Sequence, residues 1–265
     1  MRIWTVANQK GGVGKTTLVT ALSGLLAQRG HSVLMADLDP HGSLTSYFGY
    51  DPDGVEPNLY DLFRHPERPP PREVVHPTAV DGLYLLPAST ALATLDRQLG
   101  TRKGMGLVLR RGLQTLAADR FEYTLLDCPP MLGVLMINAL AACNRLVIPV
   151  QTEFLALKGL ERMVHTLEMM QRSRTRPLPY TIVPTLYDRR TRAAQRALEE
   201  LRQRYGRHIW GGAIPVDTQF REASRDGLPL TVQLPWSRGS IAVRKLLDVL
   251  IKQERAAGQE EIGDG

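Results

Sequence analysis

The chain has 265 residues, of which 43% are hydrophobic and 23% are charged, and these values predict one globular domain with a sizeable core. No apolar run approaches the roughly 20 residues of a membrane span, and the first residues do not resemble a signal peptide. We therefore expect a cytoplasmic protein. The net charge of +6 is compatible with binding to nucleic acid or another anionic partner, but a solvated surface with excess positive charge explains it equally well.

Short apolar runs alternate with helix-like runs along the whole chain. Strands are predicted at residues 3–7, 33–37, 83–87, 123–127, 145–150, 180–183 and, for a short one, 209–214. Helices are predicted at residues 16–29, 106–118, 132–142, 158–172, 192–205 and 241–254. This alternation predicts an α/β fold, a doubly wound and mainly parallel sheet with helices on both faces.

The expected domain covers residues 1–255 and is followed by a polar, acidic tail at 256–265. Residues 51–82 are rich in proline and predict a long loop or insertion, within which residues 58–64 have the pattern of one or two helical turns. Nothing in this insertion carries recognisable chemistry.

The most informative stretch is residues 9–17, which read Gln-Lys-Gly-Gly-Val-Gly-Lys-Thr-Thr between a predicted strand and a predicted helix. Glycines let backbone N–H groups approach an anion closely, and a helix N-terminus adds its dipole and its unpaired amides. Lys15 is placed to reach the β- and γ-phosphates of a nucleotide, and the Thr16 hydroxyl is placed to bind Mg²⁺. A glycine-rich turn without a ligand does not explain two lysines and two threonines in this context.

The strict phosphate-loop pattern requires glycine at position 9, where this chain has Gln9, and a second lysine, Lys10, stands beside it. The stretch resembles the deviant phosphate loop of the ParA/MinD family of P-loop ATPases. The resemblance implies ATP and Mg²⁺ as cofactors, and a Lys10 that reaches across a dimer interface to the partner subunit's nucleotide. The residues of the loop expected to bind nucleotide are Lys10, Gly11, Gly12, Val13, Gly14, Lys15, Thr16 and Thr17.

Two aspartates lie at or just after the ends of predicted strands, at the sheet edge where ligands bind in such folds. Asp39 lies in Asp-Pro-His-Gly-Ser, which is similar to the family's Asp-Pro-Gln-Gly-Asn, and is expected to orient water or hold Mg²⁺ through water. Asp127 ends an apolar strand and is expected beside Mg²⁺, so the metal set is Thr16, Asp39 and Asp127. A helix N-cap is the alternative role for Asp39. His41 could act as a base, but a surface loop position is the better interpretation.

Cys128 and Cys143 are too few for a disulfide framework, and their spacing does not fit a zinc site. The nitrogenase iron protein shares the ATPase fold and ligates an iron–sulfur cluster with two cysteines per subunit. Neither cysteine here has glycine-rich surroundings, so both are expected to be buried structural thiols.

The resemblance extends over residues 2–250. Residues 184–191 are similar to a family segment near the adenine, and Pro215, Val216 and Asp217 are similar to the segment that closes the adenine pocket. Residues 4–9, 39–50 and 59–63 look like ParC, the ParA-like ATPase that positions chemotaxis arrays at the cell pole. MinD-type proteins end in an amphipathic membrane helix, whereas this tail is polar and acidic, so no membrane binding is expected.

The resemblance implies an ATP-dependent homodimerising switch with slow hydrolysis by Lys10, Lys15 and Asp39. Its expected partners are a polar landmark or chemotaxis-array adaptor protein and an ATPase-stimulating protein. Nonspecific nucleoid DNA is the alternative cargo, because Arg190 matches a DNA-binding position of chromosome ParA proteins, although Gln219 stands where another arginine is expected. An ATP-bound scaffold with little turnover, or a metabolic ATPase such as an amidoligase or reductase component, are further alternatives.

Overall fold

The computed structural model describes residues 1–95, 105–117, 120–172, 174 and 176–263, and within these residues it forms one seven-stranded sheet. All neighbouring strands pair in parallel except β3, which is antiparallel to β4 at one edge. Across the sheet the strands are β3 (His76–Pro77), β4 (Leu83–Leu86), β2 (Val33–Asp37), β5 (Tyr123–Asp127), β1 (Arg2–Val6), β6 (Arg145–Gln151) and β7 (Tyr180–Thr185). The doubly wound, mainly parallel fold predicted from the sequence is confirmed.

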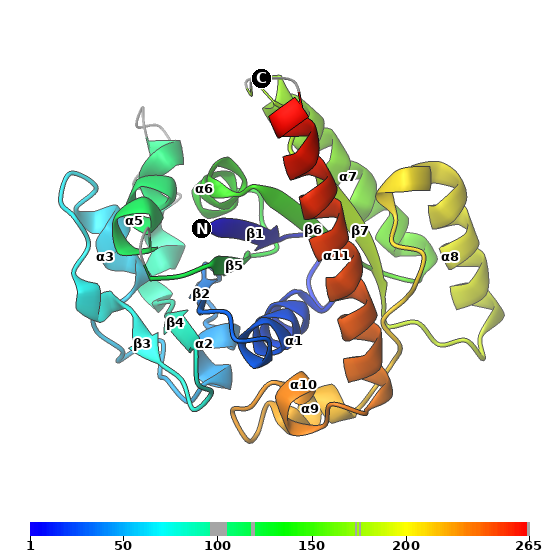
Figure 1. Ribbon diagram of the computed structural model, residues 1–265, viewed down its shortest axis with the longest axis horizontal. Coiled ribbons are helices and arrows are strands. Elements are labelled where there is room, and N and C mark those ends of the chain that lie inside the picture. The colour runs from blue at the N-terminus through cyan, green and yellow to red at the C-terminus, as the bar shows by residue number, and fades with distance from the viewer. Residues whose placement is uncertain (96–104, 118–119, 173, 175, 264–265) are drawn as a thin grey trace.

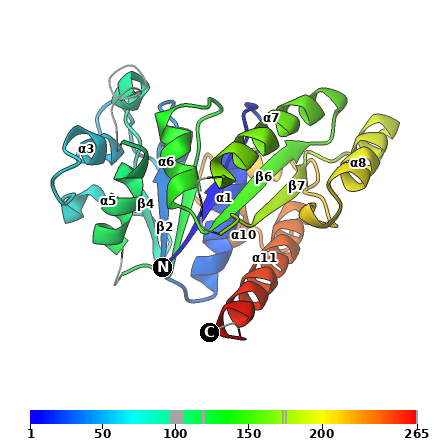
Figure 2. The ribbon, with the colours of Figure 1, turned by 90° about the horizontal axis from the view of Figure 1, so that it is seen from above.

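Helices connect the strands and cover both faces of the sheet (Figures 1 and 2). The α-helices are α1 (Lys15–Gln28), α2 (Ser43–Tyr47), α3 (Leu59–Arg64), α5 (Val108–Ala117), α6 (Val134–Ala142), α7 (Phe154–Gln171), α8 (Arg192–Tyr205), α9 (Gln219–Ala223), α10 (Leu230–Gln233) and α11 (Arg238–Gly263). Short 3-10 turns lie at Arg72–Val74, Thr90–Thr94, Met105–Leu107 and Gly206–His208.

Two hydrophobic cores lie on opposite faces of the sheet. One packs side chains of α3, α5, α6 and α7 against the sheet, and the other packs α1 and α11. Figure 2 shows these two helical layers with the strands between them. Every residue of β2 and β5 is buried, because strands in the middle of a covered parallel sheet have no solvent-facing side. Among the described residues, no helix combines the length and apolar character that crossing a membrane requires.

Helix α8 shows how the sequence pattern becomes an amphipathic element. Thr191 begins it, and its Oγ1 accepts a hydrogen bond of 3.3 Å from the backbone N–H of Ala194. Buried residues then recur at Ala194, Ala197, Leu198 and Leu201, which is the spacing of one helical face. The arginines and glutamates between them face solvent or surface partners, so the arginine-rich composition of this segment is compatible with ordinary packing.

The structure differs from the sequence prediction in several segments. Residues 209–214 form no strand: Ile209 makes an isolated bridge to Ile182, and the next bridge, from Pro215 to Tyr187, lies just beyond the segment. The pair Gly211-Gly212 offers no side chains to a pleated sheet, and a Cβ at Gly212 would lie 2.4 Å from the Trp210 ring. The edge strand β3 in the proline-rich segment was not predicted, whereas the short helix expected there is present as α3.

Helix boundaries also differ. Helix α7 begins at Phe154 rather than at residue 158, directly after β6. Helix α11 runs to Gly263, so most of the segment predicted as a tail continues the last helix. The predicted helix end at Ala118 and the last two residues, 264–265, lie outside the described residues.

Candidate nucleotide-binding site

The loop between β1 and α1 has the backbone conformation that a phosphate-binding loop requires. Gly12 and Gly14 have φ of 72° and 90°, in the left-handed region that glycine enters at little cost. A Cβ at Gly12 would meet no atom within 4 Å, so this backbone borders open space. Gly14 is the N-cap of α1, and within the described residues no side chain caps it. The first amides of α1 are therefore free to bind an anion.

This loop lines a cavity of about 470 Å³. Of the predicted site residues, Gly11, Gly12, Val13, Gly14, Lys15, Thr16, Thr17, Asp39, Pro215 and Asp217 all border it. Strand β7 helps to hold the loop in place, because the Thr185 hydroxyl at its end donates a 2.8 Å hydrogen bond to the Val13 carbonyl. Lys15 is buried, and its Nζ donates to the Lys10 carbonyl oxygen at 3.2 Å.

Lys10 does not border this cavity, and its Nζ forms an ion pair with Glu153, the residue just before α7. The backbone at Lys10 is held separately, since its N–H donates to the Asn8 Oδ1 at 3.2 Å. Asn8 in turn donates to the Pro149 carbonyl at 2.7 Å. The second lysine of the loop is thus turned toward the β6–α7 junction.

Three aspartates lie at the carboxyl edge of β2 and β5. Asp37 and Asp127 are directly opposite one another in the parallel register, and both are buried. The Thr16 hydroxyl donates to Asp127 Oδ2 at 2.6 Å, which joins the helix start to β5. Burial, followed by the charge of Asp37, raises the pKa of Asp127 well above its ordinary value. Burial raises the pKa of Asp37 to about 6.

The predicted adenine segment is held against the end of β7. Ile214 donates to the Pro184 carbonyl at 2.8 Å, Tyr187 donates to the Ile214 carbonyl at 3.0 Å, and Val216 donates to the Tyr187 carbonyl at 3.2 Å. Leu186, between them, has φ of 51° and borders the cavity, which places a strained apolar residue at its wall. The chain around Pro215 therefore forms part of the cavity wall.

Val216 and Asp217 are placed differently from Pro215. Val216 borders a neighbouring cavity of about 520 Å³ with Asp188, Arg189 and Arg238. The Asp217 carboxylate accepts hydrogen bonds from the backbone N–H groups of Gln219 and Gly239, at 3.1 and 2.9 Å. Asp217 thereby fixes the start of α11 while bordering both cavities.

Comparison with known proteins gives the family. Residues 1–179 match the family model described as AAA domain. The chain is 34% identical over 240 residues to the sporulation initiation inhibitor protein Soj of Bacillus subtilis, covering 90% of this chain and 94% of Soj. It is 33% identical over 257 residues to the chromosome partitioning protein ParA of Caulobacter vibrioides, covering 96% of each. The chain belongs to the ParA/MinD family of P-loop ATPases.

Solved structures agree with this assignment. Cobyrinic acid a,c-diamide synthase from Mycobacterium smegmatis with bound ADP and magnesium superimposes with a TM-score of 0.82, at 33% identity over 97% of this chain and 96% of that one. McdA from Cyanothece, at 21% identity, has a TM-score of 0.80 over 93% and 99% of the two chains and shows the shared fold. ATP and Mg²⁺ are the cofactors of this ParA/MinD-family site.

The residues present fit these cofactors. Open glycine amides and the buried Lys15 suit the phosphates of ATP, and the Thr16 hydroxyl with the Asp127 carboxylate suits Mg²⁺. Burial and the charge of Asp37 raise the pKa of Asp127, so a divalent cation beside this carboxylate would favour its ionised form. Mg²⁺ held by the Thr16 hydroxyl and the Asp127 carboxylate would supply positive charge that offsets the charge of the phosphates.

Three contributors to this site were not predicted from the sequence. Asp37 anchors the chain that carries Asp39, Glu153 binds Lys10, and Thr185 supports the loop. Asp37 stands at a strand end beside Asp39, which is a signal for a buried carboxylate at the site. Glu153 and Thr185 carry no comparable local signal, because their partners are distant in sequence.

The cysteines occupy the positions expected for structural thiols. Cys128 and Cys143 are both free and buried. Burial raises the pKa of both thiols, that of Cys143 to about 11. Among the described residues, no three His, Cys, Asp or Glu side chains are arranged so that they could hold a metal ion together.

Proposed function

We propose that this ATPase is a dimerising switch that uses slow ATP hydrolysis to position a cellular cargo. The position of Lys10 is the observation that supports this proposal. Lys10 belongs to the phosphate loop, yet it does not border the nucleotide cavity of its own chain. A cation in that position can serve the nucleotide of a second copy once its ion pair with Glu153 opens. In this proposal Lys15 and Thr16 bind ATP and Mg²⁺, Asp39 orients the attacking water, and Asp127 supports the metal.

Exposed apolar side chains near the same sheet edge support a second copy as the partner. Met131 and Leu132 follow β5, and Phe154 and Leu155 begin α7 just after Glu153. Their exposed fractions are 69%, 46%, 69% and 68% respectively. Large apolar residues gathered around a functional site are typical of a surface that a partner covers.

The experiment measures the oligomeric state by size-exclusion chromatography with light scattering, with and without MgATP. Wild type should dimerise transiently, Lys10→Ala should bind ATP but remain monomeric, and Asp39→Ala should form a lasting dimer because only hydrolysis is lost. Lys252→Ala, which removes an exposed lysine of α11, is the matched control. Dimers of equal lifetime in all four proteins would contradict the proposal.

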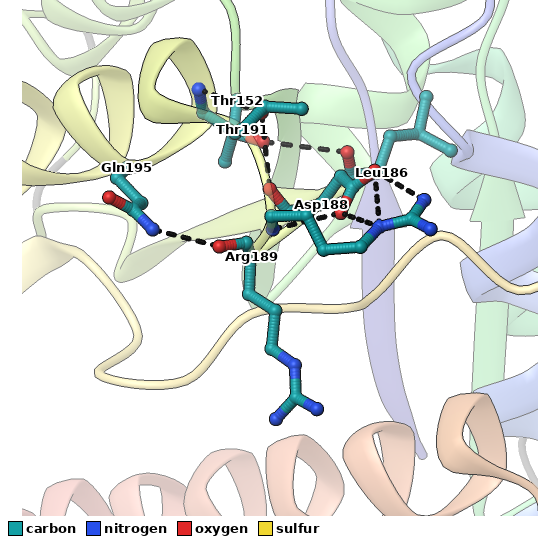
Figure 3. A network of polar contacts seen from close by, with 8 residues as sticks. Thr152, Leu186, Asp188, Arg189, Thr191 and Gln195 are labelled. Carbon is teal, nitrogen blue, oxygen red and sulfur yellow. Dashed lines mark hydrogen bonds and ion pairs between the residues drawn. The ribbon is translucent and has the colours of Figure 1, made fainter.

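The relatives named as chromosome-partitioning proteins favour DNA as what the ATP-bound dimer holds. In this chain Arg190, the predicted DNA contact, is engaged: its Nε and Nη2 donate to the Asp188 carboxylate at 2.9 and 2.8 Å. This pairing lowers the pKa of Asp188 to about 2. The side chain of Arg189 extends away from Asp188 (Figure 3), and its guanidinium has no partner among the described residues. Arg189, with Arg238 across the same cavity, is therefore the better DNA contact.

We expect ATP-dependent binding to random-sequence duplex, measured by fluorescence anisotropy at several salt concentrations. Arg189→Ala should lower affinity for all sequences and reduce the salt slope by about one unit, because one fewer phosphate is neutralised. Arg190→Ala should have a smaller effect, since its charge is already balanced by Asp188. Equal losses from both variants would contradict this assignment, and no binding by wild type would exclude DNA as the cargo.

Two alternatives remain, a different cargo and a different activity. ParC-like stretches at residues 39–50 and 59–63 support a chemotaxis array, reached through a polar landmark or adaptor protein. Imaging a fluorescent fusion beside tagged chemoreceptors and stained nucleoid distinguishes the pole from the nucleoid. The similarity to cobyrinic acid a,c-diamide synthase supports a metabolic amidoligase. ATP hydrolysis that proceeds without a small-molecule acceptor, and that a partner protein stimulates, would favour the switch over the amidoligase.

A further inference from the structure

The loop that carries Asp39 is anchored by the buried carboxylate of Asp37. Asp37 Oδ2 accepts hydrogen bonds from both the backbone N–H and the hydroxyl of Thr45, each at 2.8 Å. Asp37 Oδ1 accepts from the backbone N–H of Asp39 at 3.1 Å. Both oxygens of this buried side chain are thus used to fix the start of α2 and the position of Asp39.

The far side of the loop is closed by the proline-rich segment. Gly42 has φ of 62°, and a Cβ at this residue would lie only 2.2 Å from Cγ of Pro52. Only glycine combines this conformation with this contact. The path of the backbone between Asp39 and Gly42 is therefore set from both ends.

His41 holds one oxygen of Asp39 in two ways. Asp39 Oδ1 accepts from the His41 backbone N–H at 3.0 Å and from the His41 Nδ1 at 2.9 Å. An ionised carboxylate can only accept, so the ring carries its hydrogen on Nδ1 in this contact. Within the described part of the chain, Asp39 Oδ2 has no hydrogen-bond donor. The Asp39 side chain is 16% exposed and borders the nucleotide cavity, whereas the His41 ring is 83% exposed and lies outside it.

We propose that His41 is a positioning residue for ATP hydrolysis, which fixes the Asp39 carboxylate so that its second oxygen stays available to the attacking water. The inference rests on the proposed role of Asp39. Two donors on Oδ1 restrict rotation of the carboxylate, whereas the backbone donor alone leaves it free to turn away. Small errors in the placement of a group that orients the nucleophile lower the rate while binding is kept.

The test measures kcat and KM for MgATP hydrolysis, together with the Kd of a nonhydrolysable ATP analogue. His41→Ala should lower kcat about 10-fold and leave the analogue Kd unchanged, since the ring does not border the cavity. His41→Asn retains a side-chain N–H donor and should recover part of the loss. His165→Ala, which removes an exposed histidine of α7, should behave as wild type. In the Asp39→Ala background, His41→Ala should cause no further decrease, because it acts through Asp39.

The outcomes separate this inference from the proposed function. Wild-type kcat in His41→Ala, when Asp39→Ala is inactive, would overturn the positioning role and leave the role of Asp39 intact. A loss that persists on top of Asp39→Ala, or that comes with weaker analogue binding, would show general disruption of the loop and would also overturn it. Full activity in Asp39→Ala would overturn both.

Discussion

At the scale of single residues, three aspartates of one sheet edge differ by their surroundings. Asp37 and Asp127 are buried opposite each other, and burial raises the pKa of both. Asp39, two residues after Asp37, reaches the cavity with one oxygen unengaged among the described residues. The same functional group anchors the chain at Asp37, and in the proposed mechanism it binds the metal at Asp127 and orients water at Asp39, according to its burial and its donors.

The two thiols give a prediction at this scale. Because burial raises the pKa of Cys128 and Cys143, both should stay protonated and unreactive in the native protein at pH 8. Ellman's reagent should label neither thiol until denaturant is added, and then label both. The two thiols ionise at a lower pH in the unfolded chain than in the folded chain. Ionisation therefore stabilises the unfolded chain, and the free energy of unfolding should fall as pH rises above about 9. Rapid labelling of native protein would contradict their burial.

At the scale of elements, two helical glycines have opposite environments. A Cβ at Gly24 of α1 would lie 2.7 Å from Pro229 Cβ and 2.9 Å from the Thr231 hydroxyl. That hydroxyl donates to the Ala21 carbonyl at 2.9 Å, so the close approach between α1 and α10 is fixed on both sides. At Gly159 of α7 the nearest atoms would be at 3.6 Å or more, which is ordinary contact.

Glycine-to-alanine substitution should therefore change the free energy of unfolding in opposite directions at the two sites. Gly24→Ala should lower the free energy of unfolding by about 1–3 kcal/mol through overpacking. Gly159→Ala should raise it by about 0.5–1 kcal/mol, because alanine loses less backbone entropy in a helix. Chemical denaturation by urea measures both. Stabilisation in Gly24→Ala would show that α10 moves aside without cost.

At the scale of the whole molecule, nucleotide binding should raise the melting temperature of the protein. The cavity joins the β1–α1 loop, the loop after β2, and the segment around Pro215, so ATP contacts parts of the chain far apart in sequence. A ligand at 100 times its Kd stabilises the folded state by about 2.7 kcal/mol. For a domain of this size we expect a rise in Tm of about 5–10 °C with MgATP.

Two lysine variants make this measurement specific. Lys15→Ala should lose the rise in Tm, because it removes the buried cation of the loop. Lys252→Ala should keep it, because its side chain is exposed on α11 and does not border the cavity. An undiminished shift in Lys15→Ala would contradict the assignment of the phosphate loop. Differential scanning fluorimetry with and without EDTA also tests the dependence on Mg²⁺.

The sequence by itself determined the features whose signals are local. The loop at residues 10–17 follows from consecutive residue types between a strand and a helix, and Asp39 and Asp127 from aspartates just after apolar strands. The central strands were predictable because buried parallel strands are short, continuous apolar runs. These properties depend on neighbours along the chain, and the structure places the predicted loop at the cavity.

The tertiary structure decided which distant side chains meet. The partner of Lys10 is Glu153, and the support of Val13 comes from Thr185, contacts that no sequence periodicity encodes. Only the structure shows that the Asp188 carboxylate engages the Arg190 guanidinium, while the Arg189 guanidinium has no partner among the described residues. Residues 209–214 looked strand-like because their ends are apolar, but two glycines and the Trp210 ring at the centre prevent regular pairing. Spacing along the chain specifies the elements, whereas packing between them selects the contacts of each charged group.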